Sequence, residues 1–290
     1  MTVNSIRYNK PQDVCNIFQD SVAKIIIDWY HTIMLGKFEK LESIDSDRTY
    51  ITRKKPFRPI GNINEYYVSE AYDFAYMMTF GGIGEHRDHR SGGTIHRSNS
   101  DIFMDTFLGK LGEYAFYQYV GSDERYKDGV IVSPPNNDIN PAGIWDNGDF
   151  TILSKRKGNK KFTASVKTSK SFANVLFLEC KDYDDEGHWK NGKNDNCCED
   201  DSDCELIFMT RVAPYANGGK FEIQRSADAP EKSLITGVQW KFDIPGYITR
   251  TDLKYLIANG FVIKKGKILN GTTMMDASNY YCQAGCLRSF

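Results

Sequence analysis

The chain has 290 residues, of which 40% are hydrophobic, 13% aromatic and 26% charged. This composition is typical of a globular protein with a large apolar core, and it excludes a disordered chain, a fibrous protein and a small disulfide-stabilised scaffold. The 37 basic and 38 acidic residues give a formal net charge of -1. Any binding of a polyanion must therefore depend on a local basic surface.

The start of the chain lacks the apolar core of a secretory signal, and no apolar run approaches the roughly 20 residues that span a bilayer. The sequence therefore predicts a cytoplasmic protein with no membrane partner. Seven cysteines, an odd number, favour reduced thiols over a disulfide framework. The spacings of Cys197, Cys198 and Cys204, and of Cys282 and Cys286, match no common zinc module, so ordinary thiols are preferred over a zinc site.

Two helices are predicted in the first hundred residues. Apolar residues recur at three- and four-residue steps from about 11 to 36, and a second helical stretch rich in Tyr and Phe runs from about 64 to 80. The segment 81–100 holds three of the five histidines but few apolar residues. We interpret it as a solvated loop or as a mobile arm that binds phosphates, with a zinc site as the least favoured alternative. The arm's basic residues are Arg87, Arg90 and Arg97.

A mixed α/β unit is predicted after this arm. Apolar periodicity returns at Asp101 in a helix that contains Glu113. The runs WDNGDFTIL, KFTASVKTSK and ANVLFLECK are predicted to form one antiparallel meander, and CELIFMTRVA and TGVQWKFDIPGYI two further strands. An acidic excursion, 182–205, separates the third of these runs from the fourth. After the last strand, the sequence predicts a helix capped by Thr249 or Thr251 and then a hairpin at FVIKKGKIL. The chain thus divides into a helical region, 1–100, and an α/β domain, 101–290.

Candidate catalytic side chains lie on neighbouring elements of this domain. Because side chains alternate along a strand, Ser165 and Lys167 share one face of their run. Asp149 begins the preceding run and can face the same side, while the helix before it can deliver Glu113. Mg²⁺ prefers oxygen ligands and keeps several waters, so two carboxylates and one backbone carbonyl, such as that of Val166, suffice to hold it. Such a site can hydrolyse a phosphodiester.

At these residues the chain resembles the PD-(D/E)xK nuclease superfamily, and in particular type II restriction endonucleases. The matching pieces, in order, are GKLGE, NGD, SVKTSK, DCELIFMTRV and IPGYITRTDL, within about residues 101 to 265. The resemblance implies a restriction-endonuclease-like α+β fold, in which helices flank a mixed central sheet, and a Mg²⁺-dependent enzyme for which Mn²⁺ can substitute. It also implies that Asp149 binds the metal, that Lys167 lies beside the attacking water and that Glu113 is a supporting carboxylate.

One position departs from the family pattern. The family has Asp or Glu two residues before the lysine, where this chain has Ser165, and a hydroxyl is a poorer Mg²⁺ ligand than a carboxylate. Three explanations stay open: the two other carboxylates and the Val166 carbonyl suffice, the chain is an inactive variant, natural or engineered, or the register differs. Glu179 and Lys181 form an intact E-x-K in the next run and are the alternative catalytic pair.

Each candidate also has an ordinary structural explanation. Lys167 can be a solvated strand lysine. Glu113 can pair with Lys110 on the surface of its helix, because residues three apart are neighbours there. Asp149 can stabilise a turn in the run DNGD. The catalytic interpretation therefore requires that the three side chains meet.

A basic cluster adjoins the proposed site. Residues 151–175 include no acid and seven Lys or Arg residues, namely Lys155, Arg156, Lys157, Lys160, Lys161, Lys167 and Lys170. Such a cluster can bind DNA phosphates, with an affinity that falls as salt rises, although it can also be an exposed strand hairpin. Side-chain types that read base edges occur further along, at Arg211, Gln224, Arg225, Gln239 and Lys241.

The sequence thus predicts a Mg²⁺-dependent endonuclease of a restriction system that cuts double-stranded DNA. Cutting two strands favours a homodimer, for which the N-terminal helices are the candidate interface. A rival of a different class is a catalytically silent nucleic-acid-binding protein on the same fold, which Ser165 favours. A third interpretation is a nuclease that acts on RNA or on DNA ends.

Overall fold

The structure is a computed structural model that describes residues 38–81, 98–122, 129–137, 149–154, 160–190, 205–215 and 229–289. The chain divides into two units, Met1–Glu39 and Lys40–Phe290, and nearly all described residues belong to the second. The helix expected at 11–36 and the basic residues of the arm lie outside the described residues. No helix in the described ranges is both long and apolar enough to cross a membrane.

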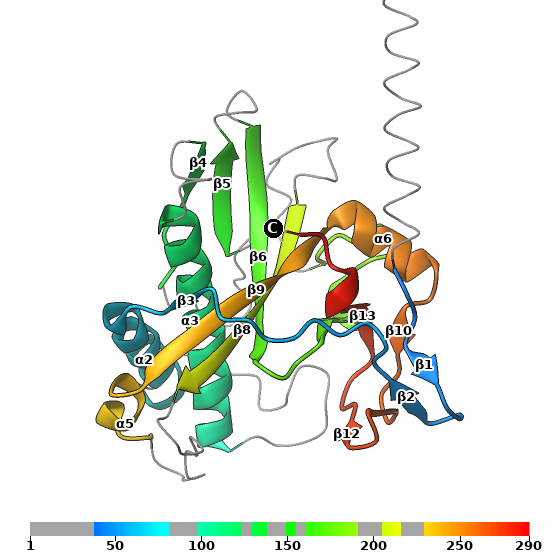
Figure 1. Cartoon of the computed structure of the whole chain (residues 1–290), viewed down its shortest axis with the longest axis horizontal. Helices are drawn as coiled ribbons and strands as arrows, with labels where there is room; N and C mark the ends of the chain where they lie inside the picture. The colour runs from blue at the N-terminus through cyan, green and yellow to red at the C-terminus, as the bar shows by residue number, and fades with distance from the viewer. Residues whose placement is uncertain are drawn as a thin grey trace, which may run out of the picture. The chain divides into compact units, whose positions relative to one another are not determined.

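A mixed six-stranded sheet forms the centre of the second unit (Figure 1). Its strand order is β3-β9-β8-β6-β5-β4. The strands are β3 (Gly61–Asn62), β4 (Val130–Val132), β5 (Phe150–Ser154), β6 (Lys160–Lys170), β8 (Glu205–Tyr215) and β9 (Gln239–Thr249). β6 and β8 run parallel, and the other neighbours are antiparallel. The predicted α+β class with a mixed sheet is confirmed.

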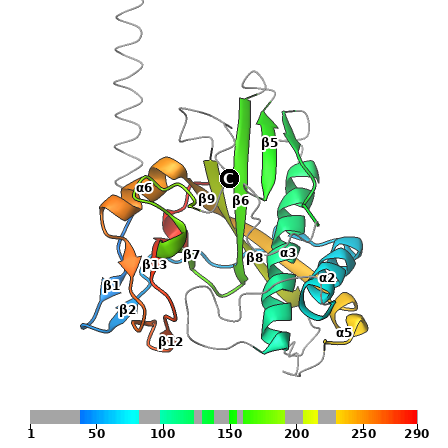
Figure 2. The ribbon, with the colours of Figure 1, turned by 180° about the vertical axis from the view of Figure 1, so that it is seen from behind.

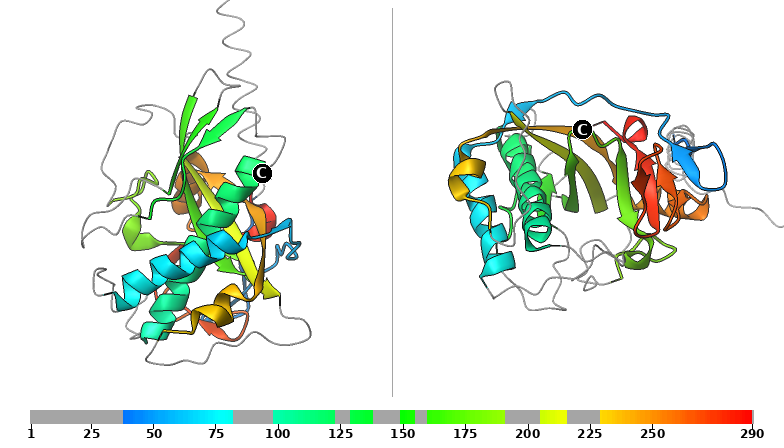
Figure 3. Two further views of the ribbon diagram at one scale, coloured as in Figure 1. Left: turned by 90° about the vertical axis from the view of Figure 1, so that its left-hand side faces the viewer. Right: turned by 90° about the horizontal axis from the view of Figure 1, so that it is seen from below.

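Helices α2 (Glu65–Phe80) and α3 (Asn99–Ser122) pack on one face of this sheet, as Figure 3 shows. Both were predicted, and Asn64 begins α2 because its side chain accepts a hydrogen bond from the Tyr66 N–H. In the core beneath them, the ring of Phe107 lies 5.2 Å from that of Trp240 in β9. Because α2 shares this core with α3, the compact unit begins near Lys40 rather than near residue 101.

The other face of the sheet is flanked by two smaller sheets. One has the order β10-β13-β7 and the other β1-β2-β11-β12. Their strands are β1 (Glu42–Ser43), β2 (Arg48–Tyr50), β7 (Val175–Glu179), β10 (Val262–Ile263), β11 (Ile268–Leu269), β12 (Thr273–Met274) and β13 (Asn279–Gln283). Helix α6 (Arg250–Ala258) follows β9 directly and is capped by Thr249, whose hydroxyl accepts from the Asp252 N–H and which was one of the two predicted caps.

Two predicted strand pairings are wrong. β5 and β6 form the expected antiparallel pair, but β7 pairs with β13 instead of continuing the meander. The reason is that both edges of β6 are already taken, by β5 and by β8. The hairpin expected at FVIKKGKIL is absent, because within the described residues β10 pairs with β13, whereas β11 pairs with β2 and β12.

Helix α3 lies unusually close to β6 at one glycine. A Cβ atom at Gly112 would lie 1.9 Å from the Thr168 hydroxyl oxygen, so no larger residue fits there without a shift. The same hydroxyl donates a hydrogen bond of 3.2 Å to the carbonyl of Gly109, one turn earlier. A Cβ at Gly109, by contrast, would meet nothing within 4 Å. The two glycines of GKLGE therefore differ in role, and Gly112 sets the distance between helix and strand.

This contrast predicts opposite effects of one substitution at two sites. Gly112→Ala forces α3 away from Thr168 and should lower the free energy of unfolding by about 1–3 kcal/mol. Gly109→Ala has room for its methyl group and should be neutral or raise it by up to about 1 kcal/mol, because alanine is the better helix former. Urea unfolding of both variants measures the difference. Equal effects would contradict the close approach at Gly112.

Candidate active site

The second half of β6 has no β5 residue beside it, because β5 is the shorter strand. Phe150, the first residue of β5, pairs with Ala164, so β6 continues past β5 from Ser165 onward. The Asp149 carboxylate fills this place and accepts a hydrogen bond of 2.5 Å from the Val166 N–H. Because the N–H and C=O of one strand residue point to the same edge, the Val166 carbonyl faces the side on which Asp149 lies. A carboxylate and a backbone carbonyl therefore meet at this edge.

Glu113 approaches the same place from α3. Its carboxylate lies 2.7 Å from the Lys110 ammonium, and the two side chains are only 17% and 7% exposed. Lys110 also donates to the Asn136 carbonyl at 2.7 Å, and its ammonium lies 4.3 Å from the centre of the Phe74 ring. The pair that offered an ordinary explanation for Glu113 is thus present, but it is buried rather than on the surface.

Burial and neighbouring charge together perturb Glu113. Burial is the largest cause, and the negative charge of Asp149 is the next, so the pKa of Glu113 is raised to about 7. The ammonium groups of Lys110 and Lys167 act in the opposite direction. Glu113 therefore lies within electrostatic range of both Asp149 and Lys167.

Lys167 completes the group. Its side chain is partly buried, so it is not a freely solvated strand lysine. Burial disfavours the ammonium, but the acidic groups around it outweigh burial and raise the pKa of Lys167. The largest of these influences come from Tyr183, Asp149 and Glu113. The three side chains that the sequence singled out therefore lie within electrostatic range of one another, and the acidic neighbours favour the charged form of Lys167.

Ser165 lies two residues before Lys167 on the same strand face, and no carboxylate occupies its place. Two residues that the sequence analysis missed lie nearby. Asp182 ends the 3-10 helix η2 (Cys180–Asp182) and acts on the charge of Lys167, and Tyr183 follows it as a buried residue. No pattern in the sequence indicated that these two residues lie near β6, because β7, a strand of a different sheet, separates them from β6 along the chain.

The alternative pair, Glu179 and Lys181, lies in that other sheet. Glu179 ends β7, and its carboxylate forms an ion pair of 3.3 Å with Lys181, whose side chain is 48% exposed. β7 is not the neighbour of β5, so this E-x-K does not stand beside Asp149 as the motif requires. Figure 2 shows β7 apart from the β5–β6 pair.

The expected DNA-binding residues are only partly described. Lys161 and Lys170 are exposed on β6, but they lie on opposite faces and about 30 Å apart along the strand. Lys160 begins β6, and its side chain lies outside the described part. Lys155, Arg156 and Lys157 also lie outside it, as do Gln224 and Arg225.

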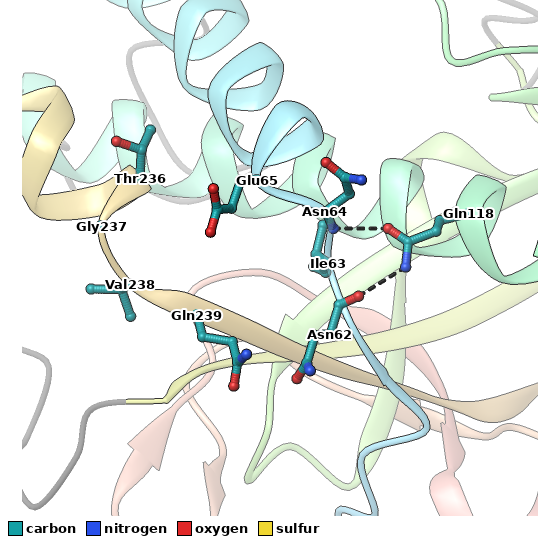
Figure 4. Close-up of a pocket in the computed structure, with 9 residues that line it drawn as sticks. All are labelled: Asn62, Ile63, Asn64, Glu65, Gln118, Thr236, Gly237, Val238 and Gln239. Atoms are coloured by element: carbon teal, nitrogen blue, oxygen red, sulfur yellow. Dashed lines mark hydrogen bonds between the residues drawn. The ribbon is translucent and has the colours of Figure 1, made fainter.

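The side chains of a type that can read base edges differ in their exposure. Arg211 is fully buried and paired with Asp243 at 2.5 Å, so it cannot reach a base edge in this fold. Gln239 is exposed, and the Lys241 ammonium lies 3.8 Å from the centre of the Tyr215 ring. A polar cavity of about 660 Å³ lies beside Gln239, between β9 and the start of α2 (Figure 4). The side chain of Gln118, which lines this cavity, accepts a hydrogen bond from the Asn64 N–H and donates one to the Asn62 carbonyl, and so joins α3 to β3.

The donor set suits a hard divalent cation. Asp149, Glu113 and the Val166 carbonyl supply only oxygen atoms, which is the ligand type that Mg²⁺ prefers. In the described ranges, no three His, Cys, Asp or Glu side chains gather closely enough to form a metal site by themselves. The described cysteines, Cys180, Cys282 and Cys286, are thiols that form no disulfide with one another, and the other candidates for zinc lie outside the described residues.

Comparison with known proteins gives no significant match to a family model, to a curated protein or to a solved structure. Functional inference therefore depends on the geometry of the chain's own residues.

The charges around Glu113 predict opposite pKa changes in two variants. Lys110→Met removes an ammonium that favours the carboxylate, so the pKa of Glu113 should rise above about 7. Asp149→Asn removes a repelling charge, so the same pKa should fall toward its ordinary value. Carbon-13 NMR titration of labelled glutamate carboxyls, without divalent cations, measures both. If Asp149→Asn left this pKa unchanged, the two carboxylates would not be neighbours.

Proposed function

We propose that the chain is a Mg²⁺-dependent endonuclease of type II restriction character that hydrolyses phosphodiester bonds in duplex DNA. The proposal is supported by the hydrogen bond that ties Asp149 to Val166 at the open edge of β6, together with the mutual electrostatic influence of Glu113, Asp149 and Lys167. Their order is also the order of the nuclease motifs, with a helix that delivers one acid followed by two antiparallel strands that deliver the other acid and the lysine.

The proposed metal ligands are Asp149, Glu113 and the Val166 carbonyl, with Mn²⁺ able to replace Mg²⁺. A bound divalent cation supplies neutralisation of the phosphate charge and a lowered pKa for a coordinated water. One Asp149 oxygen is held by the Val166 N–H, which orients the carboxylate along the strand edge. Lys110 holds Glu113 in the same manner from within α3.

Lys167 has a defined part in the proposed reaction. Its pKa is raised by its acidic neighbours, so it is an ammonium and not a general base at neutral pH. An ammonium can donate hydrogen bonds to a phosphate oxygen and to the attacking water, and it offsets the charge that develops on the phosphate. Lys167 is therefore assigned to orientation and charge stabilisation.

Ser165 leaves the site without the family's second strand carboxylate. Asp182 is a described carboxylate that acts on Lys167 from outside β6, and we assign it to supply the missing negative charge. Cleavage of both strands is most simply achieved by a two-fold dimer, which remains part of the proposal. The helix expected to form that dimer, at 11–36, lies outside the described residues.

Ser165 also favours the second candidate, a catalytically silent nucleic-acid-binding protein on the same fold. A neutral hydroxyl in place of an acid lowers the affinity for Mg²⁺, and without a bound cation the site would lose its main source of charge neutralisation. The two candidates share the same surface but differ in cleavage.

A plasmid-nicking assay with Mg²⁺ or Mn²⁺ separates these functions. We expect the wild type to cleave, and Lys167→Ala and Asp149→Asn each to lower the rate by at least ~100-fold, because each removes a charge at the reacting phosphate. Ser165→Asp should lower the Mg²⁺ concentration needed for half-maximal rate. A wild type that binds duplex DNA without cutting it would support the silent binder, and cleavage only of RNA or of DNA ends would support the third interpretation.

The same assay tests Asp182 with a matched control. Asp182→Asn should raise the Mg²⁺ requirement and slow cleavage, whereas Asp185→Asn, three residues on and exposed, removes the same charge without effect. Equal behaviour of the two variants would remove Asp182 from the site and leave the assignment of Lys167 intact.

A further inference from the structure

The segment that joins β2 to β3 is rich in basic residues. Residues 53–58, RKKPFR, include four basic and no acidic residues, and we call them the basic strap. The strap belongs to no helix or strand, and its basic residues are exposed. In Figure 1 it is the blue segment that passes across β8 and β9 on its way to β3.

The backbone of the basic strap is held at nearly every second residue. The Gln283 side chain accepts from the Arg53 N–H at 2.9 Å, and the Asn174 side chain accepts from the Lys55 N–H at 2.8 Å. The Arg53 carbonyl accepts from the Gly285 N–H at 2.9 Å. Such contacts fix an extended segment that has no hydrogen-bond ladder of its own.

A buried ion pair anchors the middle of the basic strap. The Arg211 guanidinium binds both Asp243 oxygens and also donates to the carbonyls of Lys55 and Pro56, at 2.8 and 3.1 Å. Asp243 in turn accepts from the Arg58 N–H at 3.0 Å. Burying a charged pair is costly unless every hydrogen bond is made, and here several of those bonds end on the strap. The pair therefore serves to hold an exposed, positively charged segment in one conformation.

Fixed backbone and exposed charge together give the basic strap a binding geometry. The six residues from Arg53 to Arg58 are separated by five steps, which span about 17 Å in an extended chain and match the rise of about five nucleotides along one DNA strand. The structure records no hydrogen bond or ion pair between the side chains of Lys54 and Arg58 and the described residues. These two exposed charges are thus carried by a backbone that does not have to be ordered on binding.

We propose that the basic strap is a surface that binds the sugar-phosphate backbone of duplex DNA. The positive charge and its spacing match a row of phosphates, and the strap reads no bases itself, because phosphate contacts position a duplex without specifying its sequence. This inference depends on the proposed function only for the identity of the polyanion, and it does not require that the chain cut DNA.

Salt-dependent binding of a fluorescein-labelled duplex to the full chain tests the strap, with EDTA present to prevent cutting. Each phosphate contact contributes roughly 0.9 to the slope of log affinity against log salt, so Lys54→Gln with Arg58→Gln should lower the slope by about 1.8 and weaken binding at least ~10-fold at low salt. The matched control is Lys264→Gln with Lys265→Gln, two exposed lysines in the turn after β10, which should leave the slope unchanged. Unfolding midpoints of both double variants verify that the fold is kept.

Each outcome decides between the two proposals. A slope that the strap variant leaves unchanged overturns the strap while plasmid cleavage, if present, still supports the nuclease. A slope that depends on the strap in a chain that never cleaves supports the strap and overturns the nuclease. Strap-dependent binding to anionic phospholipid vesicles but not to the duplex overturns the DNA-binding assignment, and so does a failure of the wild type to bind the duplex.

Discussion

The close approach of α3 to β6 at Gly112 is the constraint on which the candidate site depends. Thr168 fills the space that a side chain at 112 would need, and its hydroxyl bonds the Gly109 carbonyl, so the helix is held against the strand. Glu113 is the next residue of that helix, and Lys167 is the residue before Thr168. The contact therefore fixes the distance between the helix backbone that carries this acid and the strand backbone that carries this lysine, while β5 begins late enough to leave that edge of β6 open.

Charge balance explains how this group can be buried. In the described part of the site, the ammonium groups of Lys110 and Lys167 offset the charge of the Glu113 and Asp149 carboxylates, and Asp182 adds a further negative charge near Lys167. Buried carboxylates are tolerated when opposite charges and hydrogen bonds accompany them, as the contacts to Lys110 and Val166 do here. Because two ammonium groups offset much of this negative charge, phosphate and cation are expected to support each other's binding.

The sequence predicted the elements with strong local patterns. Apolar periodicity located α2 and α3, alternation located β5 and β6, and the order of the motif residues predicted that Asp149 adjoins β6, where it accepts from the Val166 N–H. These features depend on residues close to one another along the chain.

Features that depend on distant residues were not predicted. β7 reads as the next strand of a meander, but the edges of β6 were already occupied, and no local pattern reports that. Arg211 has the chemistry of a base-reading residue, yet a partner 32 positions away, Asp243, makes it an internal anchor. The basic strap reads as an ordinary polar loop, because its fixation comes from side chains as distant as Gln283.

Anomalous X-ray scattering from crystals grown with Mn²⁺ tests the central claim most directly. We predict a manganese peak bounded by the Asp149 and Glu113 carboxylates and the Val166 carbonyl, with the Lys167 ammonium beside it. Manganese bound only elsewhere, or a Glu113 carboxylate that stays with Lys110 at saturating Mn²⁺ and faces no ion, would contradict it.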